Sequence, residues 1–195
     1  MMIGIDEAGR GAWAGPIVAA AVYFKVQPRR LHPWLRDSKL LSSRQREVVY
    51  DWLQEYCQIG FGLATNHYID RHGLQRANVI VVEKAYKKLV TGYKLRVTGG
   101  IVIDYIGGFQ KLTALPSIYS LHKNGEAKFP VIAAASICAK VYRDALMTKL
   151  ARRWPLYLFD EHKGYGTRQH RQRLKEYGPS RHHRRSFRPI QSLFS

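Results

Sequence analysis

Two adjacent carboxylates follow a short apolar run near the start of the chain, in the string Gly4-Ile5-Asp6-Glu7-Ala8-Gly9-Arg10-Gly11. The glycine-arginine-glycine turn after them brings exposed backbone N–H groups beside the acids. A second apolar run, residues 100–103, also ends on a carboxylate, Asp104. Divalent cations prefer carboxylate oxygens, and a cation held in this way can promote cleavage of a phosphodiester. These residues therefore indicate metal-assisted chemistry on a sugar–phosphate backbone.

The acids need a particular strand geometry to act together. A carboxylate at the end of a buried strand is costly unless a positive group meets it, so we expect Asp6 and Asp104 at neighbouring strand ends around one cation. Glu7 points to the opposite face of an ideal strand. It can join them only if the strand bends or ends there, which Gly9 allows. The alternative for any one acid is a turn residue or an ion pair with Arg10.

A second polar pattern lies in residues 127–144, where Ser136, Lys140 and Asp144 recur at every fourth position. This spacing puts the three side chains on one face of a helix. The small residues Ala133–Ala135 beside them allow close packing against a sheet. The stripe could support a metal site or touch a phosphate, but spacing alone favours a core helix with an internal Lys–Asp pair.

A third pattern is the string His162-Lys163-Gly164-Tyr165-Gly166-Thr167. Glycines on both sides of Tyr165 favour a ring that stands clear of the backbone and meets a base or sugar. Thr167 can begin a helix whose N–H groups suit a phosphate. An exposed turn without a ligand is the alternative. We expect most of the scattered histidines, at positions 122, 162, 170, 182 and 183, to be surface or hydrogen-bonded residues.

Composition limits the class of protein and its partners. The chain has 195 residues, of which 46% are hydrophobic, enough for one packed domain. Its 32 Lys and Arg against 14 Asp and Glu give a formal charge of +18, which favours a polyanionic partner and above all nucleic acid. A solvated basic surface is the alternative on charge alone. Residues 151–195 hold 11 of the basic residues and 3 of the acidic ones.

The two cysteines, Cys57 and Cys138, lack a partner at metal-ligand spacing, so a zinc site is not expected. We expect buried free thiols in apolar, helical surroundings and a reducing, cytoplasmic compartment. No signal peptide is expected before the first strand.

Strands and helices alternate along the chain, which predicts an α/β fold. The expected strands are residues 2–6, 16–24, 58–65, 100–104 and 117–121. The expected helices run from Ser42 or Ser43 through 57, over 74–91, over 130–153, and from the cap Thr167 through 177, with an irregular basic tail after them. The first two strands are close enough in sequence to pair antiparallel, so we expect a mixed sheet.

Taken together, the strings of this chain resemble those of prokaryotic type 2 ribonuclease H, the ribonuclease HII family. They occur in the order of that family and span nearly the whole chain: Gly4–Gly11, Asp37-Ser38-Lys39, Ile103-Asp104, Ala133–Lys140 with Arg143-Asp144, His162–Thr167 and His183–Phe187. The resemblance implies a ribonuclease H-like fold, in which helices flank a central mixed sheet and a small C-terminal helical extension follows. It also implies one compact unit made of a catalytic domain, 1–155, and a basic extension, 156–195.

The resemblance implies an endonuclease that cuts RNA in RNA–DNA hybrids and cuts duplex DNA on the 5′ side of an embedded ribonucleotide. The products would carry 3′-hydroxyl and 5′-phosphate ends. The expected partners are these nucleic acids, with no membrane, and the protein is expected to act as a monomer. The sequence neither requires nor excludes contact with a sliding clamp.

The resemblance also implies roles for single residues. Asp6, Glu7 and Asp104 would bind Mg²⁺ or Mn²⁺, with two ions when substrate is bound. A fourth catalytic acid would stand eighteen residues before Asp144, which is Glu126 here, where the family usually has aspartate. The extra methylene of glutamate favours contact with the metal through water. Two further departures are Tyr105, in place of a common glycine, and Ala12, in place of a frequent proline.

The expected substrate contacts follow the same motifs. The backbone of Gly9, Arg10 and Gly11 would read the 2′-hydroxyl that separates RNA from DNA. Tyr165 would pack on the sugar after the ribonucleotide and favour deoxyribose there. The expected phosphate contacts are Ser38, Lys39 and Arg184, for which surface capping and charge are the alternative.

Two other functions stay open at this point. A non-catalytic, basic nucleic-acid-binding protein would explain the charge. An enzyme with the same fold but another substrate, such as a DNA junction or a transposon end, would explain the acids.

Overall fold

The structure, a computed structural model, describes residues 2–26, 28–35, 38–104 and 112–194. Two positions that entered the comparison with the family, Asp37 and Tyr105, lie outside these residues. The described strands form one sheet in the order β3-β2-β1-β4-β5, with the bounds β1 Ile3–Ala8, β2 Ile17–Phe24, β3 Cys57–Ala64, β4 Ile101–Asp104 and β5 Tyr119–His122. β1 pairs antiparallel with β2 and parallel with β4. The predicted mixed sheet and the antiparallel first pair are therefore confirmed.

Helices of very different length connect and flank the strands. Their bounds are α1 Ser43–Tyr56, α2 Asn66–His72, α3 Leu74–Gly92, α4 Gly125–Lys128, α5 Pro130–Arg153, α6 Phe159–His162, α7 Arg168–Tyr177 and α8 Arg188–Phe194, with 3₁₀ turns η1 Ser38–Leu40 and η2 Pro155–Tyr157. The four longest begin and end within about one residue of the predicted positions. Ser42, one of the two predicted starts of α1, caps it and forms a capping box with Gln45. Thr167 caps α7 as predicted, and Pro130 opens α5.

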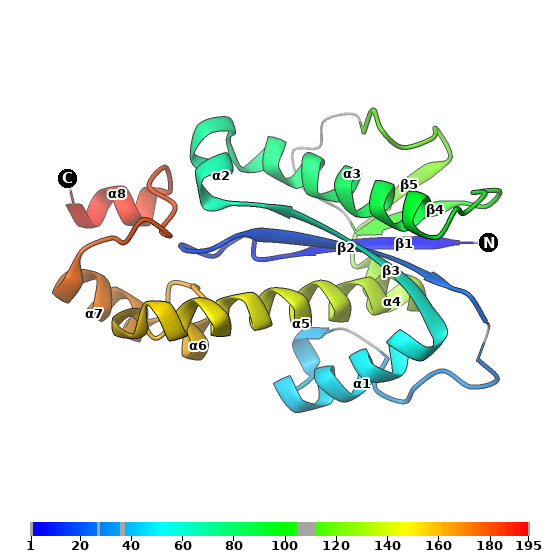
Figure 1. Cartoon of the computed structure of the whole chain (residues 1–195), viewed down its shortest axis with the longest axis horizontal. Coiled ribbons are helices and arrows are strands. Elements are labelled where there is room, and N and C mark those ends of the chain that lie inside the picture. The colour runs from blue at the N-terminus through cyan, green and yellow to red at the C-terminus, as the bar shows by residue number, and fades with distance from the viewer. Residues whose placement is uncertain (1, 27, 36–37, 105–111, 195) are drawn as a thin grey trace.

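The sheet lies between two layers of helices (Figure 1). Helices α2 and α3 cover one face, and α5 and α1 cover the other. Side chains alternate between the two faces of β1, so the strand contributes to both layers of the core. Ile3 and Ile5 belong to the core under α3, and Ala8 belongs to the core under α5. Gly4 lies so close to the backbone of α5 at Val131 that a side chain there would overlap it. This close approach brings the polar face of α5 next to the end of β1.

Three predictions on local structure are wrong. Cys57 begins β3 and does not lie in a helix, although both thiols are buried and free as predicted. The first strand continues to Ala8, two residues beyond its predicted end. The tail after residue 177 is not wholly irregular, because α8 forms where Phe187, Ile190 and Leu193 recur at helical spacing.

The C-terminal helices lie at the end of the molecule where β1 turns into β2 (Figure 1). Backbone contacts join the two regions. The N–H of Trp13 donates to the Gly164 carbonyl at 2.8 Å, and the N–H of Arg184 donates to the Trp13 carbonyl at 2.7 Å. The turn between the first strands is therefore fixed by segments more than 150 residues away in the chain. Among the described residues, no helix combines the length and apolar character that crossing a bilayer requires.

Candidate functional site

A pocket of about 240 Å³ opens at the end of β1 and β4. The three predicted acids, Asp6, Glu7 and Asp104, line one part of it. The rest of the lining includes the loop Gly9–Gly11, Ser38 and Lys39 from η1, Ser136 and Lys140 from α5, and Tyr165. The fold thus collects in one place residues from segments spread over most of the sequence. Of the predicted site residues, Glu126 and Arg184 do not line this pocket.

The parallel pairing of β1 with β4 brings the acids together. Ile5 lies opposite Ile103, so Asp6 and Asp104, the next residues, emerge at the same edge of the sheet. Asp6 faces α5 and forms a hydrogen bond with Ser136. Glu7 is still within β1, which ends one residue later, and yet it lines the same pocket.

The electrostatics of this pocket favour a cation. Burial raises the pKa of Asp6 well above its ordinary value of 3.8, and the charges of Glu7 and Asp104 raise it further. Burial likewise raises the pKa of Glu7 from 4.5 to about 7, although Arg10 partly opposes the shift. A divalent cation would offset both penalties, and carboxylate oxygens suit Mg²⁺ or Mn²⁺. Among the described residues, no three His, Cys, Asp or Glu side chains stand close enough to form a ready-made metal site.

Glu126, the predicted fourth acid, lies beside the pocket on α4 and is almost fully buried. One carboxylate oxygen accepts a hydrogen bond from Ser136 at 3.1 Å, and the other forms an ion pair with Lys39 at 3.1 Å. The neighbouring N–H of Gly125 donates to Asp104 at 2.8 Å. Ser136 therefore contacts both Glu126 and Asp6, and it links the fourth acid to the first.

The loop Gly9–Gly11 is held in shape by a buried arginine. Arg184 is fully buried, and its guanidinium donates to the carbonyls of Gly9, Arg10 and Gly15 at 2.7, 2.9 and 3.1 Å. Burial lowers the pKa of Arg184 to about 9. The predicted phosphate contact of Arg184 is thus corrected: its donors are directed at the loop and its side chain has no exposed surface.

Glycine is required at one of the two loop glycines and not at the other. Gly9 has φ +91°, and a side chain there would overlap Arg143. Gly11 is exposed, and a methyl group on it would meet nothing within 4 Å. Gly9 therefore serves the fold, whereas the space around Gly11 is left open toward the pocket.

Tyr165 is half-buried beside the same loop. The guanidinium of Arg143 lies 5.2 Å from the centre of its ring, and Nζ of Lys140 lies 5.7 Å away. Gly166 packs against the indole of Trp13, so the flanking glycine serves close packing as well as exposure of the tyrosine. The ring borders the pocket with part of its surface exposed.

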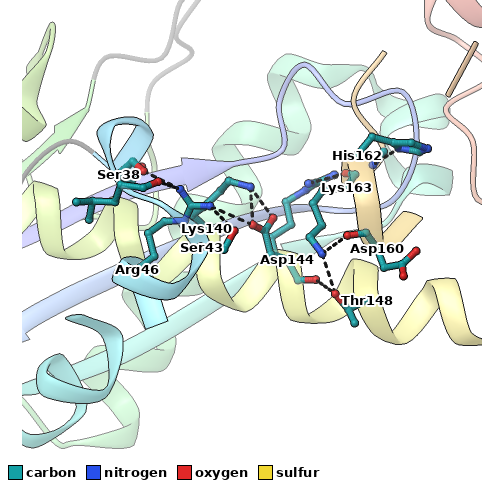
Figure 2. A network of polar contacts seen from close by, with 12 residues as sticks. Ser38, Ser43, Arg46, Lys140, Asp144, Thr148, Asp160, His162 and Lys163 are labelled. Carbon is teal, nitrogen blue, oxygen red and sulfur yellow. Dashed lines mark hydrogen bonds and ion pairs between the residues drawn. The ribbon is translucent and has the colours of Figure 1, made fainter. Parts of the chain in front are cut away.

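A charged network continues from the pocket along α5 (Figure 2). Lys140 donates to both oxygens of Asp144 at 2.6 Å, as the predicted internal Lys–Asp pair requires. Arg46 lies 3.9 Å from Asp144 and donates to the carbonyls of Ser38 and Leu41 at 3.0 and 2.6 Å. The network thereby ties the η1 turn, which carries Ser38 and Lys39, to helix α5.

A second and larger pocket, of about 560 Å³, lies next to this network. Its charged lining comes from Arg46, Lys149, Arg152 and Lys163 together with Glu47 and Asp144. Its acids stand on helices α1 and α5, away from the strand ends where β1 and β4 bring carboxylates together. The smaller, acidic pocket is therefore the candidate active site.

Three histidines that the sequence left scattered form one buried cluster, His162, His170 and His183. The rings of His162 and His170 stack with centres 4.2 Å apart, and Nε2 of His170 lies 3.0 Å from Nε2 of His183. They come from α6, α7 and the segment after α7. No periodicity within one element could have revealed the cluster.

Comparison with known proteins agrees with this geometry. A sequence model described as ribonuclease HII matches residues 3–190. The ribonuclease HII of Bacillus licheniformis is 41% identical over 190 residues, covering 97% of this chain and 70% of that protein. A ribonuclease HII of Thermus thermophilus is 41% identical over 191 residues, covering 97% of this chain and 87% of that protein.

Solved structures show the same fold. The chain resembles one in the PCNA:RNase HII complex from Archaeoglobus fulgidus, with a TM-score of 0.79 at 23% identity, covering 100% of this chain and 97% of that one. It also resembles Bst-RNase HIII in complex with Mn²⁺, with a TM-score of 0.78 at 20% identity, covering 98% of this chain and 68% of that one. The predicted ribonuclease H-like fold is confirmed.

Proposed function

Because this chain belongs to the ribonuclease HII family of hydrolytic endonucleases, which cleave the RNA of RNA–DNA hybrids, we propose that it also cuts duplex DNA on the 5′ side of an embedded ribonucleotide. The proposed products carry 3′-hydroxyl and 5′-phosphate ends. One observation supports the proposal above the others: three carboxylates at strand ends line the same pocket as the loop Gly9–Gly11 and Tyr165.

In this proposal Asp6, Glu7 and Asp104 hold Mg²⁺ or Mn²⁺. A bound divalent cation supplies activation of water and stabilisation of the leaving oxygen. The chain itself supplies the negative charge through the buried Asp6 and the half-buried Glu7, whose raised pKa values a cation would lower. Glu126 acts through Ser136, which contacts both Glu126 and Asp6.

Substrate reading is proposed for the loop Gly9–Gly11 and Tyr165, which line the same pocket as the acids. Arg184 fixes the carbonyls of Gly9 and Arg10, so the loop is shaped before a ribose arrives. The exposed Gly11 leaves room for a 2′-hydroxyl beside the backbone. Tyr165 borders the same pocket and is proposed to pack on the following deoxyribose. Lys39, with its side chain 79% exposed, is proposed to contact a phosphate, and the buried Ser38 to support it.

The test is cleavage of a DNA duplex that contains a single ribonucleotide, with Mg²⁺ and Mn²⁺ in parallel and a chelator as the blank. We expect one cut on the 5′ side of the ribonucleotide and none in the matched all-DNA duplex. Equal cutting of both duplexes, or none of either, would reject the proposal. Retained binding without any cleavage would favour the basic binding protein instead.

Tyr165→Ala separates this proposal from an enzyme of the same fold with another substrate. We expect the variant to lose its preference for deoxyribose after the ribonucleotide. Tyr93→Ala, at an exposed tyrosine that directly follows α3, should keep it. An unchanged preference in the Tyr165 variant would favour the alternative substrate. We further propose a monomer in the cytoplasm, the compartment that suits two free thiols, and light scattering of the purified protein tests the monomer.

A further inference from the structure

The buried histidine cluster lies outside the acidic pocket and has no part in the proposed chemistry. His170 is fully buried, His183 is 1% exposed and His162 is 7% exposed. The residues come from three segments that meet at the end of the molecule where α6, α7 and the β1–β2 turn lie together (Figure 1). Three imidazoles in one apolar site need their hydrogen bonds matched, because an unmatched buried polar atom is costly.

The partners of the rings determine where each proton must be. Nδ1 of His170 lies 3.0 Å from the Tyr165 carbonyl, which can only accept, so this nitrogen carries the proton. Nε2 of the neutral ring must then accept from Nε2 of His183 at 3.0 Å. Nδ1 of His183 in turn accepts from the N–H and hydroxyl of Ser180, both at 2.9 Å. The direction of each bond in this relay follows from the one before it.

The third ring is fixed in the same way. Nδ1 of His162 accepts from the N–H of Gly164 at 3.1 Å, and Nε2 donates to the Tyr157 carbonyl at 2.8 Å. His162 and His170 thus contact the backbone on either side of the loop that carries Tyr165. All three rings are neutral and each is restricted to one tautomer, His170 protonated on Nδ1 and the other two on Nε2.

The relay ends next to the loop that is proposed to read ribose. His183 is followed by Arg184, whose guanidinium holds the carbonyls of Gly9, Arg10 and Gly15. His183 also pairs with Ala14 through an isolated β-bridge. The relay therefore connects the backbone of Tyr165 to His183. The next residue, Arg184, supports the Gly9–Gly11 loop.

We propose that the His170–His183 pair is a positioning unit that sets the Tyr165 loop relative to the Gly9–Gly11 loop, and through this spacing determines selectivity for deoxyribose after a ribonucleotide. The tautomer assignment stands on geometry alone, whereas the effect on selectivity rests on the proposed function. A neutral imidazole is suited to the place because it donates from one nitrogen and accepts at the other across the width of the ring.

The first test does not depend on activity. Nitrogen-15 NMR of histidine-labelled protein near neutral pH reads the tautomer of each ring. We expect His170 protonated on Nδ1 and His183 on Nε2. Finding His170 protonated on Nε2, or either ring doubly protonated, would overturn the relay, whatever the enzyme cleaves.

The second test uses His183→Asn, whose side-chain oxygen can still accept from Ser180 but whose amide is too short to reach His170. Two substrates are compared: a single ribonucleotide followed by DNA, and a ribonucleotide followed by RNA. We expect the ratio of kcat/KM for the first over the second to fall about tenfold or more. His183→Gln, whose amide nitrogen lies near the position of Nε2, should restore part of that ratio. The control is His67→Asn, at an exposed histidine on α2.

Thermal unfolding and the amide spectrum of each variant establish that it is folded. A merely structural histidine would lower both rates together with the melting temperature and leave the ratio unchanged, and that result would overturn the proposed positioning. If the wild-type protein cleaves neither substrate, the proposed function fails, while the NMR test still decides the relay.

Discussion

The acidic pocket and the histidine cluster bury ionisable groups at the same end of the sheet in opposite ways. In the pocket, carboxylates face one another, and burial raises the pKa of Asp6 and of Glu7. In the cluster, each ring has a donor and an acceptor partner from the chain, and burial lowers the pKa of His170 to about 3 and of His183 to about 4. A bound cation would stabilise the pocket, whereas each ring of the cluster already has its hydrogen-bond partners within the chain. The comparison separates groups arranged for a ligand from groups arranged for the scaffold.

The largest expected effect is on the pocket side of this comparison. Asp6→Asn removes a carboxylate from the proposed metal site, so we expect cleavage to fall about 10³-fold or more while substrate binding is retained. Without metal, the same change should raise the free energy of unfolding at alkaline pH, because the wild-type carboxylate is buried beside like charges. Single-turnover cleavage and chemical denaturation measure the two effects.

Asp51→Asn on the exposed face of α1 is the matched control and should change neither quantity. If Asp6→Asn destabilised the metal-free protein, Asp6 would be part of the scaffold and the contrast between the two regions would fail.

The next effect is on the scaffold side. Arg184→Lys leaves one ammonium where a guanidinium serves three backbone carbonyls, so we expect the free energy of unfolding to drop by roughly 3 kcal/mol. Arg185→Lys, at the exposed neighbour, should leave it nearly unchanged. Urea denaturation compares the two. A loss of substrate affinity in Arg184→Lys at full stability would restore the original interpretation of Arg184 as a phosphate contact.

The two loop glycines sharpen the comparison within a single turn. Gly9→Ala should cost roughly 2 kcal/mol of stability, because it combines a positive φ with overlap against Arg143. Gly11→Ala should change stability by less than about 0.5 kcal/mol and yet lower cleavage, because its methyl group occupies open space beside the pocket. Thermal unfolding and cleavage rates are measured on both variants. Equal stability losses would show that both glycines serve the fold.

The two regions should also depend on pH in opposite directions. Glu7 has a folded pKa of about 7 against 4.5 ordinarily, so in metal-free protein its contribution to stability falls as pH rises between these values. His170 and His183 resist protonation when folded, so their contribution is complete above pH 6.5 and is lost as pH falls toward 4. Each ring should account for about 1.4 kcal/mol per pH unit within that range.

Unfolding free energies of wild type and His183→Asn, measured over this range, isolate the histidine contribution because Glu7 is common to both. The difference between the two proteins should shrink as the solution is acidified. A difference that stays constant would show that His183 becomes protonated in the folded state at its ordinary pKa.

Local patterns predicted the elements well where each signal was complete within a few residues. The capping box at Ser42 and the cap Thr167 depend on hydrogen bonds inside one turn. Pro130 suits the first position of α5 because an N–H there would have no partner within the helix. The wrong predictions fell where a distant partner decided the outcome. The last helix, α8, forms because Ile190 is buried against Trp13 and Leu174. The spacing of Ile190 and Leu193 is a local signal, but the residues they pack against lie in α7 and in the β1–β2 turn, outside residues 188–194.

The sequence by itself determined the family, the mixed α/β fold and the acids that end two apolar runs, because motif order and apolar periodicity are properties of consecutive residues. Only the tertiary structure decided that Arg184 supports a loop, that Glu126 meets Ser136 and Lys39, and that three separate histidines share one relay. Each of these depends on which side chains the packing of α5 and α7 buries together. Hydrogen-bond partners then determine which nitrogen of each ring carries the proton, and burial raises the pKa of the pocket carboxylates.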